Sequence, residues 1–127
     1  MPFNATVTKG VNSAGQNMAY TKNYSGDQAA NIDETIADSS TDVEILVAVD
    51  QSALKIIVFY ADVAMTVKTN DSGSPDDTLN LEAGKPMIWE EGESPDLIST
   101  DLTAIYVSNA SGSEGQLKMV ALTDPLT

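Results

Sequence analysis

Residues 41–50 read TDVEILVAVD, and this stretch determines the fold expected for the chain. Every second residue in it is β-branched and apolar: Val43, Ile45, Val47 and Val49. A period of two is typical of a β-strand that buries one face, because successive side chains point to opposite sides. Residues 54–60 (LKIIVFY) follow after a turn at Gln51 and Ser52 and are apolar almost without interruption. That pattern predicts a second strand, buried on both faces.

Short strands of this kind are predicted along the whole chain. Those after residue 60 are 64–69, 78–81, 87–90, 103–108 and 116–122, with residues 109–115 joining the last two as a hairpin. Segments 5–11 and 17–24 flank a turn at 12–15, and segment 29–37 reads as a strand or as one to two helical turns. Roughly nine or ten short strands separated by turns indicate an all-β, antiparallel β-sandwich. Jelly-roll and immunoglobulin-like sandwiches share this pattern, so both remain open.

The length of 127 residues predicts a single sandwich domain spanning residues 1–127. Residues 1–27 contain few core-forming side chains, so we expect them to form a peripheral hairpin or an arm that orders on a partner. The candidate interface residues are Phe3, Met18, Tyr20, Tyr24 and Trp89. Trp89 ends an apolar strand, where it would serve as a core residue, an interface anchor or a platform for a sugar.

The chain contains no histidine, cysteine or arginine, and it has 19 acidic residues against six lysines. It therefore lacks the usual general base, thiolate nucleophile and bidentate phosphate clamp, so we expect no enzyme and no catalytic residues. A net charge of −13 disfavours nucleic acid and anionic membranes as partners. Residues 1–5 lack a secretory signal pattern, and no stretch is long and apolar enough to span a membrane. These features predict synthesis in the cytoplasm.

Two acidic clusters could carry chemistry. Asp71, Asp76 and Asp77 lie in a polar loop at residues 70–77, where oxygen ligands suit calcium, although the spacing does not fit an EF-hand. A solvated turn is the simpler reading, so no cofactor is expected beyond a weak calcium site. A second patch comprises Glu90, Glu91, Glu93, Asp96 and Asp101. Paired carboxylates can hydrolyse glycosides, but acidic loops of this kind are common, and hydrolysis is the least favoured reading.

The second half of the chain resembles small all-β virion proteins of tailed bacteriophages, of the capsid-decoration or cement type. The likeness is carried by segments 66–70, 75–81, 83–86, 88–89, 101–107, 109–112 and 122–125. The resemblance implies a structural protein on the capsid exterior that binds the major capsid protein and stabilises the shell. It also implies a homo-oligomer, with a trimer favoured. A neck, tail or fibre component is the alternative within the virion, and a carbohydrate-binding or adhesion module is the alternative outside it.

Overall fold

The computed structural model describes residues 3–93 and 96–124, so Pro95 and Pro125 lie outside the described residues. The described residues form ten strands and one short 3-10 helix, and all strand pairs are antiparallel. The elements are β1 (Phe3–Ser13), β2 (Gln16–Gly26), β3 (Gln28–Ile36), β4 (Ser40–Val49), η1 (Gln51–Ala53), β5 (Leu54–Ala61), β6 (Met65–Thr69), β7 (Thr78–Leu81), β8 (Met87–Glu90), β9 (Leu102–Asn109) and β10 (Gly115–Thr123). The all-β prediction is confirmed, and the ambiguous segment 29–37 is a strand.

Eight of these strands form a jelly roll. One four-stranded sheet has the order β3-β10-β5-β8, and the other has the order β4-β9-β6-β7. The pairs β3–β10, β4–β9, β5–β8 and β6–β7 are the pairs of one long hairpin whose closed end is the loop at residues 70–77. Rolling that hairpin up adds the pairs β5–β10 and β6–β9, which is the two-sheet arrangement of a jelly roll. The immunoglobulin-like alternative is wrong.

The predicted hairpin between residues 103–108 and 116–122 is also wrong. β9 and β10 belong to different sheets, so segment 110–114 crosses from one sheet to the other. Asn109 fixes this crossing. Its buried side-chain amide donates to the carbonyl oxygens of Ile36 at 3.1 Å and Ser113 at 2.8 Å, while its Oδ1 accepts from the backbone and hydroxyl of Ser111. The polar loop at residues 110–114 therefore connects the two sheets and is not a hairpin turn within one sheet.

The core lies between the two sheets. Ile57 and Phe59 of β5 pack there against residues such as Ile105 and Val107 of β9, all fully buried. The other face of β5 is also partly covered, since Ile56 is buried in a second, smaller apolar cluster outside the sandwich. β5 therefore has apolar residues on both faces, as its continuous apolar run predicted.

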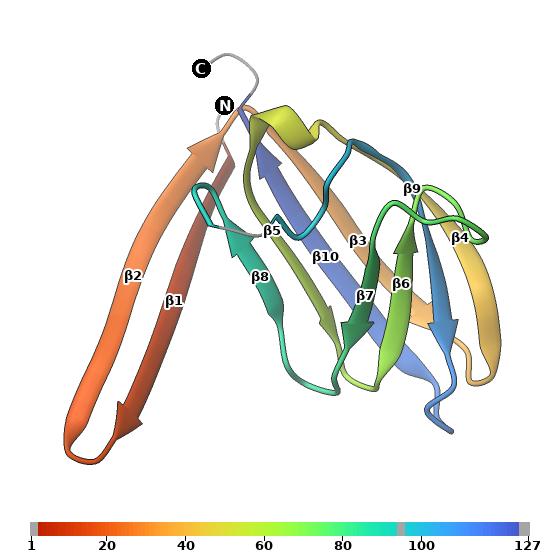
Figure 1. The fold of residues 1–127 in the computed structure, drawn as a ribbon, viewed down its shortest axis with the longest axis horizontal. Coiled ribbons are helices and arrows are strands. Elements are labelled where there is room, and N and C mark those ends of the chain that lie inside the picture. The colour runs from red at the N-terminus through yellow and green to blue at the C-terminus, as the bar shows by residue number, and fades with distance from the viewer. Residues whose placement is uncertain (1–2, 94–95, 125–127) are drawn as a thin grey trace.

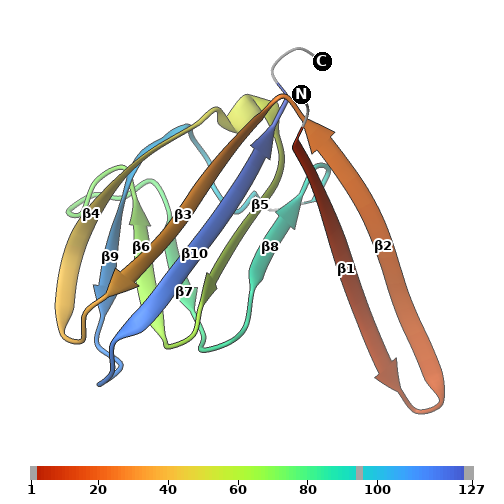
Figure 2. The same cartoon turned by 180° about the vertical axis from the view of Figure 1, so that it is seen from behind.

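Strands β1 and β2 form a separate two-stranded sheet, called the arm below. The arm leaves the sandwich beside the end of β10, and its hairpin end lies well away from both sheets (Figures 1 and 2). Ala14 and Gly15 close the hairpin with φ values of 55° and 78°, as a two-residue type I′ turn requires. At the other end of the arm, a Cβ on Gly26 would come within 2.4 Å of the carbonyl oxygen of Thr123, so glycine permits the close approach of arm and sheet.

Candidate functional site

The arm has two chemically different faces. Residues that are directly opposite in an antiparallel pair share a face, and the register pairs Ala5 with Tyr24, Val7 with Lys22 and Val11 with Met18. One face is therefore mainly apolar, aromatic or cationic: Phe3, Ala5, Val7, Lys9, Val11, Met18, Tyr20, Lys22 and Tyr24, with Ser13, Gln16 and Gly26 at its two ends. The opposite face carries only asparagine, threonine, serine, glycine and alanine. Such an amphipathic ribbon is built to lay one face on another surface.

The apolar face of the arm is covered by the sandwich only around Val7 and Tyr24. Val7 and Tyr24 pack with Ile56 and Leu122 on the outer surface of the sheet β3-β10-β5-β8. Towards the hairpin end the same face is open, with Val11 59% and Met18 56% exposed. The distal half thus offers apolar surface that no other part of the described chain covers.

A buried carboxylate holds the arm to the sandwich. Glu90, at the end of β8, is only 2% exposed, and its carboxylate faces three donors from the arm. Lys9 Nζ lies 2.8 Å from Glu90 Oε2, the Tyr24 hydroxyl donates to Oε1 at 2.7 Å, and the Tyr20 hydroxyl donates to Oε2. Lys9 also contacts the Glu93 carboxylate at 3.2 Å. We call Glu90 and its three donors the latch.

The latch shifts the pKa values of its members. Burial alone would raise the pKa of Glu90, but the hydrogen bonds from Lys9, Tyr20 and Tyr24 outweigh it and lower the value from 4.5 to about 2. The hydrogen bond to Glu90 is also the main reason why the pKa of Lys9 is raised. The pKa of Tyr24 is raised by its burial and by the same carboxylate. Glu90 is therefore an ionised structural group at neutral pH.

Charge divides the chain at the base of the arm. Residues 1–26 contain Lys9 and Lys22 and no acidic residue, so all 19 acidic residues lie in residues 27–127 with the other four lysines. The formal charges are therefore +2 for residues 1–26 and 4 − 19 = −15 for the remainder. Lys22 stands 5.0 Å from the centroid of the Tyr24 ring. The arm is the one large segment without negative charge.

The five candidate interface residues do not form one surface. Phe3, Met18 and Tyr20 are exposed on the apolar face of the arm, whereas Tyr24 and Trp89 are buried. Trp89 is 8% exposed and packs in the core, with its indole N–H donating to the carbonyl oxygen of Glu93 at 3.2 Å. Of the aromatic residues assigned to the carbohydrate-binding alternative, Trp89 is therefore not an exposed platform, whereas Tyr20 is exposed.

The acidic patch at residues 90–101 is not a carboxylate pair in a cleft. Glu91 pairs with Lys55 at 2.9 Å, and Asp101 accepts a hydrogen bond from the backbone of Gln51. Asp96 accepts one from the Gln51 side chain. Glycoside hydrolysis requires a carboxylic acid with a raised pKa, whereas the pKa of Glu90 is lowered. This geometry gives the hydrolase reading no support.

The three carboxylates proposed for calcium are not brought together. Asp71 accepts from the backbone of Gly73, Asp77 accepts from the backbone and hydroxyl of Ser99, and Asp76 accepts from Asn70 and Thr100. The hydrogen bonds from Asn70 and Thr100 lower the pKa of Asp76. Across residues 3–93 and 96–124, no group of three acidic side chains is placed to hold a metal ion. The loop binds the neighbouring segment 99–103 instead.

Asn70 makes most of the hydrogen bonds that join this loop to segment 99–103. Its replacement by glycine should therefore destabilise the protein by about 1–2 kcal/mol. Its side chain joins Asp76, Thr100, the carbonyl oxygen of Asp101 and the backbone N–H of Thr103. Glycine suits the φ of 68° at this position, so the variant removes the side-chain bonds without adding backbone strain. Chemical denaturation measures the loss. Asn70→Asp should also destabilise, because it places a carboxylate against Asp76; full stability in both variants would contradict this role.

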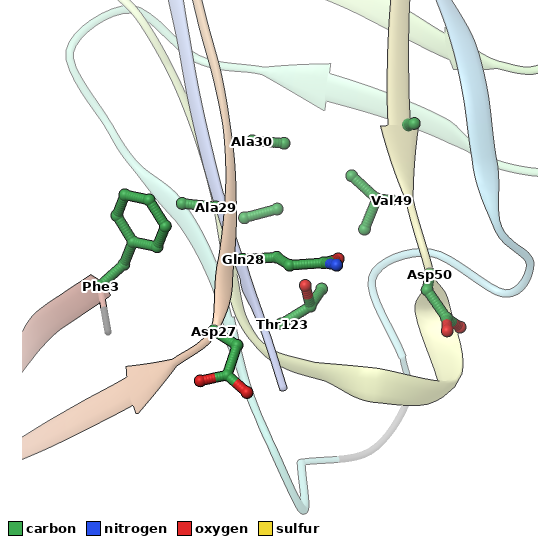
Figure 3. A pocket seen from close by; sticks show the side chains of 10 residues that line it. Phe3, Asp27, Gln28, Ala29, Ala30, Val49, Asp50 and Thr123 are labelled. Carbon is green, nitrogen blue, oxygen red and sulfur yellow. The ribbon is translucent and has the colours of Figure 1, made fainter. Parts of the chain in front are cut away.

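A cavity of about 350 Å³ opens at one end of the sandwich, between β3 and β4. Gln28, Val49 and Thr123 point into it, and Phe3 also lines it (Figure 3). Asp50 stands at its rim and caps η1, accepting from the backbone N–H of Ser52 at 3.0 Å. Its lining gathers no set of convergent charged groups, so the arm remains the candidate functional site.

Sequence reasoning identified Tyr20 and Tyr24 but missed Lys9 and Val11, and it placed Glu90 at the end of a strand only as a member of an acidic patch. Two signals point to these residues. Odd-numbered positions from 3 to 11 are apolar or lysine, while the even-numbered positions are asparagine, threonine or glycine. Acidic residues are also absent from the first 26 positions, which separates the arm from the remainder of the chain.

No protein-family model, curated protein or solved structure matches this chain. None of the helices in residues 3–93 and 96–124 is long and apolar enough to cross a membrane.

Proposed function

We propose that this chain is a non-enzymatic structural protein of a bacteriophage virion, which decorates the head exterior and stabilises the shell as a homo-oligomer. The observation that carries a binding role is the arm, which Lys9, Tyr20 and Tyr24 hold to the buried Glu90 while Val11 and Met18 beyond them are exposed. Maintaining such a ribbon in water exposes apolar surface, which is characteristic of a contact site. The virion setting rests on the resemblance of the second half of the chain to decoration proteins.

The jelly roll is compatible with this proposal, because that architecture occurs in viral capsid and lectin domains, although a fold alone does not define a function. The strongly acidic sandwich disfavours contact with packaged nucleic acid. Binding of the decorating protein only to the assembled shell would stabilise the shell by mass action, without any chemical step. A neck, tail or fibre component is the alternative within the virion.

The proposal is tested by counting copies of the protein in purified virions, with quantitative mass spectrometry against the major capsid protein. A copy number of the same order as that of the shell subunits supports head decoration. A few copies per particle would instead place the protein in the neck, tail or fibres. Absence from particles would overturn the virion proposal and make a glycan array the next experiment.

A further inference from the structure

The exposed distal face of the arm continues a surface that is already used for packing. Val7 and Tyr24 bury the proximal part of this face against the sheet β3-β10-β5-β8, and Val11 and Met18 extend it beyond the Lys9–Tyr20 pair. Both distal side chains are more than half exposed. A partner that covers them must offer an apolar surface like the one that covers Val7.

The protein itself carries such a surface. A groove of about 330 Å³ lies between residues 5–8 of β1 and the outer face of the sheet, where Ile56, Val58, Ile88 and Val120 line it. Val120 is partly exposed, whereas Ile56 is already buried in the cluster that Val7 and Tyr24 of the arm cover. None of the groove residues is charged.

We propose that the distal apolar face of the arm docks into this groove of a second copy of the chain. The inference specifies the contact of the homo-oligomer in the proposed function, and it rests on that function only in requiring self-association. Each copy presents one distal face and one groove, so two copies can exchange arms reciprocally, or a small ring can close head to tail. Both arrangements bury Met18 of one copy beside Val120 of another.

Charge favours a second copy that approaches through these surfaces. Two sandwiches with a formal charge of −15 each repel one another, and this repulsion is weakest where acidic residues are absent. The arm contains no acidic residue, and the groove lining contains no charged residue of either sign. Contact between the arm of one copy and the groove of another therefore buries apolar area without bringing carboxylates together.

Sedimentation of purified protein over a wide concentration range tests the contact. We expect an oligomer with a mass that is a multiple of 13.4 kDa. Met18→Asp should weaken association by about tenfold or more, because it would bury an unpaired charge in the groove. Asn17→Asp adds the same charge to the neighbouring position on the polar face, so it should associate like the unmodified protein. A monomer at all concentrations, or equal effects of the two variants, would overturn the proposal.

Cross-linking then tests the register of the contact. Because the chain has no cysteine, single-cysteine variants are unambiguous. A mixture of Met18→Cys and Val120→Cys proteins should form a heterodimer with a short bismaleimide. A mixture of Met18→Cys and Leu46→Cys should not, since Leu46 is exposed on β4 of the other sheet. Equal cross-linking in both mixtures would refute docking in the groove. The copy number in virions is a separate measurement, so either proposal can fail alone.

Discussion

Replacement of Glu90 by alanine should lower the free energy of unfolding by about 3 kcal/mol and loosen the arm. The substitution removes the acceptor of three donors and leaves the buried Tyr24 hydroxyl without its partner. Unsatisfied buried polar groups are costly, because water cannot replace the lost bond. Chemical denaturation measures the loss. Hydrogen exchange should locate this loss in the arm. Relative to the unmodified protein, the substitution should accelerate exchange of amides in β1 and β2 more than exchange of amides in β5.

The neighbouring residue provides a matched control. Glu91→Ala removes one carboxylate from the same segment, but Glu91 is 55% exposed and pairs with Lys55 at the surface. An exposed ion pair contributes little, so the expected loss is below about 1 kcal/mol. If both variants lost the same stability, or if amides of the arm exchanged at equal rates in both, the latch would not be what holds the arm.

Local patterns made most of the strands predictable. The alternation at 43–49 marks the two faces of β4 but reports burial only in part: Val49 is buried and Ile45 and Val47 are half-buried, whereas Val43 is exposed. The apolar run at 54–60 corresponds to β5, whose residues are all buried or half-buried. Segments 78–81 and 87–90 match β7 and β8 residue for residue. The pairing of the strands is harder to predict from the sequence than the strands themselves. Segment 110–114 has the composition of a hairpin turn, yet β9 pairs with β4 and β6, which are distant in sequence.

The latch could not be predicted from local sequence for the same reason. Glu90 lies 81 positions after Lys9, and its burial depends on the arm folding back against β8. In the sequence, Glu90 is one of several acidic residues in a row. Trp89 shows the converse: its neighbours favoured a core residue but left an interface anchor open, and packing between the sheets placed it in the core.

The latch should also make stability depend on acidity. The pKa of Glu90 is about 2 in the folded protein and 4.5 when the group is unperturbed, so the folded state favours the ionised form. Its contribution is therefore complete above pH 4.5 and is lost as the pH falls through about 2. The difference between the two pKa values corresponds to about 3 kcal/mol at most. The charged and titratable groups around the carboxylate are Lys9, Tyr20, Tyr24 and Glu93.

Comparison with Glu90→Gln isolates this contribution from that of the other carboxylates. The glutamine variant retains the size of the side chain and cannot ionise, so the difference in unfolding free energy between the two proteins should be largest near neutral pH. It should shrink below pH 4.5 and nearly vanish close to pH 2, because protonated Glu90 resembles glutamine. Denaturation curves at constant ionic strength give both values at each pH. A difference that stayed constant from pH 7 to pH 2 would show that Glu90 is not ionised in the latch.

At alkaline pH the stability should change in the opposite direction, falling as the pH rises. The pKa of Lys9 is raised by its hydrogen bond to Glu90, so its contribution is complete below its ordinary value of 10.5 and is lost as the pH rises through the raised value. The arm is therefore expected to be held most firmly between pH 4.5 and pH 10.5. Glu90→Gln should weaken this alkaline dependence too, because Lys9 then lacks its main partner. An unchanged alkaline profile would mean that Lys9 draws its stabilisation from Glu93 alone.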